Sequence, residues 1–184
     1  MNEIRRPISE SYWVEPGQFL AGEHPAKFDE EQTRRRVDTF IETGIDTFID
    51  LTQANETFPY TRILAEQANV YGVEAAHHRF PIGDFGLPSD QMMNAILDKI
   101  DQSLRDRRKI YLHCWGGIGR TGTTVGCYLV RHGKTAEAAL DQLWTWWRGV
   151  PKSLYHPYSP ETQDQVNFIR TWMERDQRLR KIGL

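Results

Sequence analysis

The sequence predicts an α/β fold in which helices flank a central, mostly parallel sheet. Its 184 residues suffice for one hydrophobic core but not comfortably for two, because single domains commonly hold about 100 to 200 residues. Short runs of β-branched and aromatic residues alternate with segments of helical periodicity, which is typical of parallel sheets. No repeat or linker divides the chain. We therefore expect a single domain over residues 1–184, with its core at about 10–172 and a helical tail after it.

Two short strands and a helix are expected first. The segment SYWVEPGQFLAGE, residues 11–23, carries two β-rich runs around Pro16 and Gly17, which favour a hairpin or a pair of edge strands. Residues 29–44 begin with acidic side chains, place apolar ones at helical spacing and finish with a glycine that suits a helix end. A strand is then predicted over residues 45–52, IDTFIDLT, because Ile, Phe and Thr favour strands.

The second half of the chain alternates in the same way. A weak helical pattern over about residues 59–70 precedes a predicted strand over 73–82, and the loop GDFGLPSD follows. Ser89 or Asp90 can cap a helix over 90–106, because both side chains accept hydrogen bonds from a first turn. The remaining predicted elements are a strand over 109–113, a helix over 119–133, a helix capped by Thr135 that reaches Trp147, and a last helix over about 160–180.

The segments 73–82, 90–106 and 109–113 form a predicted β-α-β unit. Such units cross over with a right-handed sense, which makes the two strands parallel and brings their carboxyl ends to the same sheet edge. Open α/β sheets bind ligands at that edge. We therefore expect the loop that holds Asp84 and the loop that begins at Cys114 to emerge side by side at a binding site.

Composition and charge argue against several classes of protein. The 23 Lys and Arg residues nearly balance the 25 Asp and Glu residues, and the net charge of −2 indicates neither a nucleic-acid partner nor an anionic membrane surface. No apolar run is long enough for a membrane helix, and the first residues lack a signal-peptide pattern. We expect a cytoplasmic monomer whose two cysteines are reduced thiols rather than a disulfide.

The most informative segment is KIYLHCWGGIGRTG, residues 109–122. A predicted strand ends at Cys114, and a helix begins near Arg120. The loop between them contains three glycines and can turn its backbone N–H groups inward to bind an anion. The residues expected to bind phosphate in this way are Trp115, Gly116, Gly117, Ile118 and Gly119. The side chain of Trp115 can also face the pocket entrance and influence substrate choice.

The side chains of this loop suit the binding of a phosphate dianion and nucleophilic attack on its phosphorus by a cysteine thiolate. The following helix directs its positive N-terminal end at the loop, and the planar guanidinium of Arg120 can hold two phosphate oxygens. The same field favours the thiolate of Cys114, which is the nucleophilic form. A cysteine at the end of a buried strand can instead be a small core residue. The combination of His113, the glycines, Arg120 and Thr121 favours the catalytic interpretation.

At these residues the sequence resembles the cysteine-dependent protein tyrosine phosphatase superfamily. Its signature, His-Cys-x5-Arg followed by Ser or Thr, is met by His113, Cys114, Arg120 and Thr121. The chain is most similar to the dual-specificity branch, of the compact cyclin-dependent-kinase-associated type, through RFPIGDFGLPS before the cysteine and more weakly SPETQDQVNFI after it. The resemblance implies the superfamily's fold and a reaction through a cysteinyl-phosphate intermediate, with no metal or other cofactor.

The resemblance also implies roles for individual residues. Asp84 is expected to protonate the leaving oxygen and then to activate water, although it could serve only as a turn residue. Thr121 is expected to stabilise the departing thiolate, or else simply belongs to a first helical turn. Gln165 is expected to position the water, or else is a surface glutamine. We expect His113 to orient the loop and to help keep the thiolate through hydrogen bonds rather than to act as a base.

The expected substrate is a phosphorylated protein that carries phosphotyrosine, and also phosphoserine or phosphothreonine, by resemblance to the family. An RNA 5′-triphosphate or a phosphometabolite is a second candidate. Phosphoinositides rank low because no lysine lies between Cys114 and Arg120. A rhodanese-like sulfurtransferase and a phosphate-binding module without turnover are further alternatives. The presence of Cys114, Arg120 and Asp84 argues against the binding module, which needs neither a nucleophile nor an acid.

Overall fold

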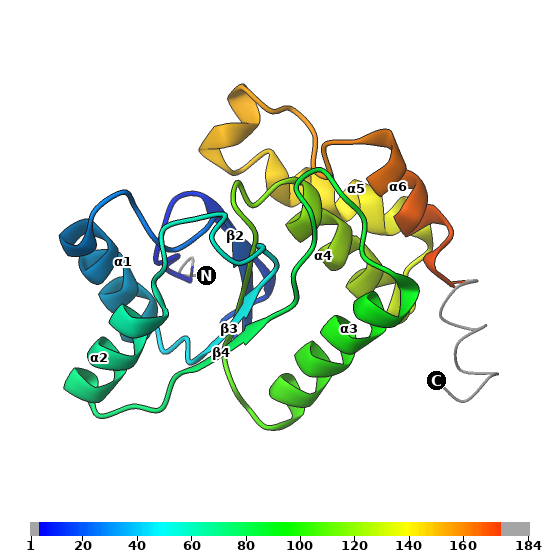
Figure 1. Cartoon of the computed structure of the whole chain (residues 1–184). Helices are drawn as coiled ribbons and strands as arrows, with labels where there is room; N and C mark the ends of the chain where they lie inside the picture. Colours follow the sequence, from blue (N-terminus) through cyan, green and yellow to red (C-terminus); the bar gives the residue numbers. More distant parts are fainter. Residues whose placement is uncertain (1–3, 174–184) are drawn as a thin grey trace.

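The structure, a computed structural model, describes residues 4–173, and these residues contain a five-stranded sheet flanked by helices (Figure 1). The strands are β1 (Ser11–Glu15), β2 (Phe19–Gly22), β3 (Thr47–Asp50), β4 (Ala76–Arg79) and β5 (Ile110–His113). The helices are α1 (Glu30–Glu42), α2 (Thr61–Tyr71), α3 (Asp90–Arg105), α4 (Gly119–Arg131), α5 (Ala136–Trp147), the short 3₁₀ helix η1 (Pro151–Leu154) and α6 (Gln163–Arg170). The predicted α/β fold class is confirmed.

Helices cover both faces of the sheet. In Figure 1, α1 and α2 lie together on one side, whereas α3, α4, α5 and α6 lie on the other. Two clusters of buried apolar side chains match this division, one of which includes Phe40 and Ile63, and the other Ile96 and Leu140. Every residue of α4 except its last is buried, so α4 is the central helix of its layer. Within residues 4–173, no helix has the length and apolar character needed to cross a membrane.

The sheet brings the carboxyl ends of three strands to the same level. The strand order is β1-β2-β5-β3-β4, and β1 pairs with β2 in the antiparallel sense while the other pairs are parallel. His113 at the end of β5 is opposite both Gly22 on β2 and Asp50 on β3. The loop after β5 therefore begins between two neighbouring strand ends, at the edge where ligands bind in such sheets.

As predicted, β4 and β5 are parallel and have their carboxyl ends at the same sheet edge, but they are not adjacent, because β3 lies between them. The loops that follow β4 and β5 nevertheless meet. After β4 the chain runs along the end of β3, where Phe80 N–H donates to the carbonyl of Asp50 and Ile82 N–H donates to the carbonyl of Leu51, at 2.8 and 3.0 Å. These hydrogen bonds lead the segment that holds Asp84 across β3 towards the loop after β5.

Local signals determine where most helices begin and end. Asp29, Ser89 and Thr135 precede α1, α3 and α5, and each side chain accepts a hydrogen bond from a backbone N–H of the first turn. Asp90 is the first residue of α3 rather than its cap. Gly44 follows α1 with a left-handed backbone angle, φ +83°, as its predicted position requires.

The last helix is shorter than predicted at its start. Thr162 and Gln165 form a reciprocal capping box, in which each side chain accepts a hydrogen bond from the backbone N–H of the other residue. This cap makes Gln163 the first residue of α6, instead of a residue near 160. The helix ends at Arg170, and the predicted continuation over 174–180 lies outside the described residues.

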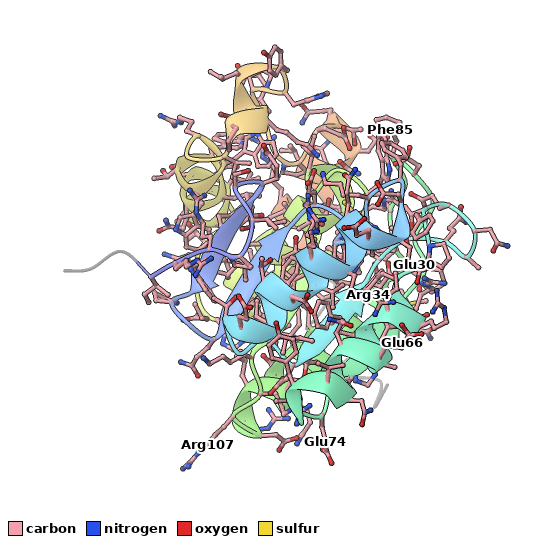
Figure 2. All side chains as sticks on the ribbon, turned by 90° about the vertical axis from the view of Figure 1, so that its left-hand side faces the viewer. Glu30, Arg34, Glu66, Glu74, Phe85 and Arg107 are labelled. Carbon is pink, nitrogen blue, oxygen red and sulfur yellow. The ribbon has the colours of Figure 1, made fainter. Side chains whose placement is uncertain are left out.

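Ion pairs join the two helices of the smaller layer. Figure 2 shows Glu30 and Arg34 on α1 beside Glu66 on α2. Arg34 pairs with Glu30 at 3.1 Å and with Glu66 at 2.7 Å. Exposed pairs of this kind add little stability individually, so the buried cluster beneath them holds α1 and α2 on the sheet.

Candidate active site

The loop between β5 and α4 begins at a buried cysteine. Cys114 directly follows β5 and is 2% exposed. Gly117 has a left-handed backbone angle, φ +76°, and a Cβ atom at this position would collide with the backbone of Gly22. Glycine is therefore needed for the loop to pack against the end of β2. The predicted residues Trp115, Gly116, Gly117 and Ile118 all lie in this loop, and Gly119 is the first residue of α4.

The backbone of this loop offers donors to an anion. Three of its carbonyl groups accept hydrogen bonds: Trp115 from His24 N–H at 3.0 Å, Gly116 from Lys152 Nζ at 3.2 Å, and Ile118 from Ser159 Oγ at 2.8 Å. In a trans peptide the N–H points away from the carbonyl of the same unit. Within residues 4–173, the N–H groups of residues 116–118 donate to no acceptor. Such a row of unpaired donors suits an oxyanion.

Arg120 is 3% exposed and is held by two carboxylates. Its Nη1 and Nη2 atoms donate to both oxygens of Glu56, at 2.8 and 2.5 Å, in a bidentate pair. Nη1 also donates to the carbonyl of Ile82 at 3.0 Å, and Nη2 donates to Oδ1 of Asp84 at 3.0 Å. Burial opposes the charge, but the bonds to Glu56 and the nearby Cys114 outweigh it and raise the pKa of Arg120. The guanidinium is thus a fixed cation.

A cavity of about 260 Å³ brings the predicted catalytic residues together. Cys114 and Arg120, from the cysteine loop and the start of α4, line it together with Asp84 from the loop after β4. The side chain of Asp84 is 53% exposed, and its only ion pair within residues 4–173 is with Arg120. The neighbouring Phe85 also lines the cavity, and Figure 2 shows it towards the upper end of the molecule. The geometry therefore allows Asp84 to face a group bound at the cysteine loop.

A second carboxylate, Glu161, lines the same cavity. It packs against Gly119 so closely that a Cβ atom on the glycine would collide with Oε1 of the glutamate. Burial and the negative charge of Asp84 raise the pKa of Glu161 above its ordinary value. Two acidic side chains with different surroundings thus share the cavity, one paired with Arg120 and the other packed against Gly119 with a raised pKa.

A buried polar network lies behind the cysteine. Nδ1 of His113 lies 3.2 Å from the carbonyl oxygen of Cys114, and Nε2 lies 2.7 Å from the hydroxyl of Tyr60. Burial lowers the pKa of His113 to about 4, so the ring is neutral near neutral pH. One tautomer then satisfies both contacts, because Nδ1–H donates to the carbonyl and Nε2 accepts from Tyr60. His113 thus contacts the loop through the carbonyl of Cys114, and its predicted effect on the thiolate stays a prediction.

Thr121 and Gln165 are both fully buried but differ in their contacts. Thr121 lies in the first turn of α4, and its hydroxyl has no hydrogen-bond partner among residues 4–173. Gln165 is not a surface residue, since its Oε1 accepts from Thr162 N–H and its Nε2 donates to the carbonyl of Gly86 at 3.3 Å. It therefore links α6 to the loop that holds Asp84. The roles of both residues in the reaction stay predictions.

Reasoning from the sequence missed several side chains near the loop, including Glu56, Lys152, His156 and Glu161. Only one of them had a usable signal. Glu56 follows β3 at the same sheet edge as Cys114, and loops at that edge carry ligand-binding residues in α/β folds. Lys152 and Glu161 come from η1 and from the segment before α6, which no strand directs to the site. Their positions depend on how these segments pack across the loop.

A buried cysteine, an anion-binding loop and a fixed arginine at the carboxyl edge of an α/β sheet are together typical of cysteine-dependent phosphatases. The chain belongs to the PTP-SAK family, described as Swiss Army Knife protein, DSP-PTPase phosphatase domain, which matches residues 9–177. The resemblance to the dual-specificity branch is thereby confirmed.

Relatives and solved structures agree with this family. Cyclin-dependent kinase inhibitor 3 of Sus scrofa is 29% identical over 100 residues, which are 53% of this chain and 46% of that protein. The match thus spans about half the length of this relative. The crystal structure of Tk-PTP in the active form aligns with a TM-score of 0.69 at 24% identity, over 90% of this chain and 97% of that one. PTPMT1 in complex with PI(5)P aligns with a TM-score of 0.66 at 15% identity, over 92% and 98%. The two structural likenesses show the fold alone.

Proposed function

We propose that this protein is a protein phosphatase that hydrolyses phosphotyrosine, and also phosphoserine or phosphothreonine, through a cysteinyl-phosphate intermediate. The observation that carries the proposal is the convergence of Cys114, the unpaired loop N–H groups and Arg120 around one cavity. The loop and the guanidinium supply the contacts that a phosphate dianion needs. Membership of the PTP-SAK family supports phosphatase chemistry and offers no support for a rhodanese-like sulfurtransferase.

The proposed reaction has two steps. In the first, the thiolate of Cys114 attacks phosphorus, the bond to the leaving oxygen breaks, and Asp84 donates its proton to that oxygen. In the second, Asp84 accepts a proton from water while the water attacks the cysteinyl-phosphate, which releases inorganic phosphate and the thiolate. Thr121 would donate a hydrogen bond from its hydroxyl to the departing thiolate, and Gln165 would help to position the water. Each step balances without a cofactor.

The shape of the cavity supports an aryl phosphate as the preferred substrate. Cys114 is 2% exposed, whereas Phe85 and Trp115 are 62% and 60% exposed and line the same cavity. A phosphate must therefore pass two exposed aromatic side chains to reach a buried nucleophile. The phenyl ring of phosphotyrosine has the length for this approach and packs favourably against other aromatic rings. The shorter side chains of phosphoserine and phosphothreonine make fewer such contacts.

Charges around Arg120 argue against polyanionic substrates. Glu56, Asp84 and Glu161 place three carboxyl groups around one guanidinium. Additional phosphates on an inositol ring, a lipid headgroup or an RNA 5′-triphosphate would be repelled by these groups. PTPMT1 was solved with PI(5)P, but its likeness to this chain is one of fold. A single phosphate on an otherwise neutral group suits the site better, which supports a phosphoprotein over the non-protein alternatives.

The proposal is tested by comparing wild type and Cys114→Ser with two substrates, p-nitrophenyl phosphate and a phosphotyrosine peptide, in the presence of EDTA. We expect Cys114→Ser to abolish turnover and to retain peptide binding, because the loop and Arg120 remain. Cys127→Ala is the matched control, since Cys127 is the other buried cysteine and lies within α4. It should retain a kcat close to that of wild type.

Three outcomes would contradict the proposal at different points. Turnover by Cys114→Ser near the wild-type rate would remove the nucleophile assignment. Hydrolysis of p-nitrophenyl phosphate without hydrolysis of any phosphopeptide would indicate that the substrate is a non-protein phosphate. Peptide binding by wild type without turnover of either substrate would favour the binding module.

A further inference from the structure

A second cavity lies next to the one that holds Cys114. Its volume is about 470 Å³, and it shares Trp115 and Lys152 with the first cavity. Its other walls come from the segment between β2 and α1 and from the loop between β3 and α2. A group bound in the second cavity would therefore lie directly beside a phosphate held by the cysteine loop.

Aromatic side chains give the second cavity an exposed apolar surface. Phe28 is 95% exposed, Trp115 is 60% exposed and Phe58 is 37% exposed. They come from three segments that are far apart in the sequence, yet all three line one concave surface. Exposed large apolar side chains gathered around a hollow are typical of a binding site rather than of a core.

Both lysines that line this cavity are paired with one neighbouring carboxylate. Glu23 pairs with Lys27 at 3.2 Å and with Lys152 at 2.6 Å, and it also pairs with Arg36. Burial opposes the charge of Glu23, but the hydrogen bond from Lys152 and the charge of Arg36 outweigh it and lower the pKa of Glu23 to about 2. The carboxylate therefore stays ionised and keeps both lysines occupied at neutral pH.

The remaining titratable groups of the cavity do not favour a second phosphate either. Burial lowers the pKa of His24 to about 3, so its ring is uncharged near neutral pH, and it contacts the hydroxyl of Thr57 at 2.8 Å. Glu56 is negatively charged and is held by Arg120. A second phosphate would meet the carboxylate of Glu56 and would compete with Glu23 for the two lysines among these lining residues. A neutral, apolar group is the ligand that this surface suits.

We propose that the second cavity binds an apolar side chain adjacent to phosphotyrosine in the substrate, so that the protein selects phosphotyrosine sites flanked by a residue such as phenylalanine or leucine. This inference rests on the proposed function and adds sequence specificity to it. The two cavities share Trp115 and Lys152 in their walls, so neighbouring residues of one bound peptide would occupy both. Phe28 and Phe58 are then specificity-determining residues that take no part in the chemistry.

The test uses a phosphotyrosine peptide with glycine on both sides, and variants in which phenylalanine or aspartate replaces one flanking glycine at a time. With wild type, we expect kcat/KM to rise about tenfold for phenylalanine at one flanking position, as partial burial of a phenyl ring predicts. Aspartate at that position should give no rise. Phosphoserine at that position should also give none, because its phosphate would have to displace Glu23 from the two lysines of the cavity.

Substitutions in the protein then test whether the side chains of the second cavity cause this preference. Phe28→Ser should remove most of the preference for the phenylalanine-flanked peptide. Because Phe28 is highly exposed, the variant should fold like wild type, which circular dichroism measures. Phe58→Ser should act in the same direction. Neither should change kcat/KM for the glycine-flanked peptide or for p-nitrophenyl phosphate. Val70→Ser is the matched control, since Val70 is 73% exposed on α2 and lines neither cavity.

Failure of this inference and failure of the proposed function give different results. Equal kcat/KM for phenylalanine-flanked and glycine-flanked peptides with wild type would overturn the apolar subsite and leave the phosphatase intact. An equal loss of preference in Val70→Ser would do the same. A preference for the phosphoserine-flanked peptide would overturn the neutral character of the subsite. Hydrolysis of p-nitrophenyl phosphate but of none of the peptides would instead overturn the protein substrate.

Discussion

Under the proposed function, the N–H groups of Arg120 would couple substrate binding to the position of Asp84. A guanidinium has five N–H donors, and the four on its terminal nitrogens match four contacts, two with Glu56, one with Ile82 and one with Asp84. Nε–H donates to no acceptor within residues 4–173. A phosphate that binds the edge formed by Nε and Nη2 must therefore displace Asp84 from Nη2. Binding of substrate would release the acid beside the leaving group.

At this residue scale, the variants Asp84→Asn and Glu161→Gln test which of the two acidic side chains of the cavity protonates the leaving oxygen. We expect Asp84→Asn to lower kcat about a hundredfold or more for phenyl phosphate and much less for p-nitrophenyl phosphate, because a basic leaving oxygen depends most on a proton donor. Glu161→Gln should leave this dependence on the leaving group unchanged. The measurement is kcat and KM over a series of aryl phosphates. If kcat depended more steeply on the leaving group in Glu161→Gln than in wild type, and Asp84→Asn showed no such change, Glu161 rather than Asp84 would be the proton donor.

The two variants should also differ in how KM depends on pH. The raised pKa of Glu161 keeps this group neutral to a higher pH than an ordinary glutamate, and above that pKa it becomes an anion next to the phosphate. We therefore expect the KM of wild type to rise as the pH increases through this transition, and the rise to be absent in Glu161→Gln.

At the scale of elements, α4 begins at one glycine, Gly119, and is followed by another, Gly133, and the two are needed for different reasons. A Cβ atom at Gly119 would collide with Glu161 and would lie 2.8 Å from Nε2 of Gln165. Gly133, after the end of α4, has a left-handed backbone angle, φ +94°, and nothing within 4 Å of a Cβ atom built there. The first glycine therefore permits close packing of the segment before α6, whereas the second permits a turn.

Alanine substitutions should distinguish the packing requirement at Gly119 from the turn requirement at Gly133. Gly119→Ala should lower kcat/KM about tenfold or more, because displacement of Glu161 and Gln165 disturbs the loop that holds Asp84. Gly133→Ala should leave kcat/KM unchanged and lower the free energy of unfolding by about 1 kcal/mol, because the backbone angle disfavours a side chain. Steady-state kinetics and urea unfolding measure the two effects. Wild-type kinetics in Gly119→Ala would contradict the packing argument.

At the scale of the whole molecule, buried polar groups join several elements behind the active-site edge. Asp50 at the end of β3 accepts hydrogen bonds from His77 and Arg79 of β4, and Oδ1 lies 3.9 Å from Nδ1 of His113 on β5. His24, between β2 and α1, packs edge-on against His113. Burial lowers the pKa of His113 to about 4 and that of His24 to about 3. Both rings are therefore neutral in the folded protein.

The two histidines predict how stability depends on pH. The unfolded chain takes up protons near the ordinary histidine pKa of 6.5, whereas folded His24 and His113 do so only near 3 and 4. Between these values the unfolded state binds more protons, so the contribution to stability is fully present above 6.5 and is lost as the pH falls towards 4. From about pH 7 to about pH 5, each histidine should lower the free energy of unfolding by on the order of 1–2 kcal/mol.

Urea unfolding at a series of pH values measures this dependence, and His24→Asn should remove about half of it. In wild type, Nδ1 of His24 accepts a hydrogen bond from the N–H of Ala26 at 3.1 Å. The side-chain oxygen of asparagine can accept the same hydrogen bond. A free energy of unfolding that stayed constant over this pH range would contradict the assignment of two neutral buried rings.

The sequence by itself determined the order of strands and helices, most of the helix caps, the cysteine loop and the candidate acid. These features are local, because periodicity, capping side chains such as Ser89 and Thr135, and the spacing of Cys114 and Arg120 all lie within short segments. The family signature added the expected fold, because the same loop recurs in one architecture.

Only the tertiary structure decided which strands are neighbours and which side chains surround Arg120. The position of β3 between β4 and β5 depends on pairing between distant segments, and no local pattern specifies it. Glu56 and Glu161 reach the site from opposite ends of the chain, and the burial of Gln165 follows from packing against α4. Contacts of this kind arise from the free energy of the whole packed chain, which short-range sequence patterns do not contain.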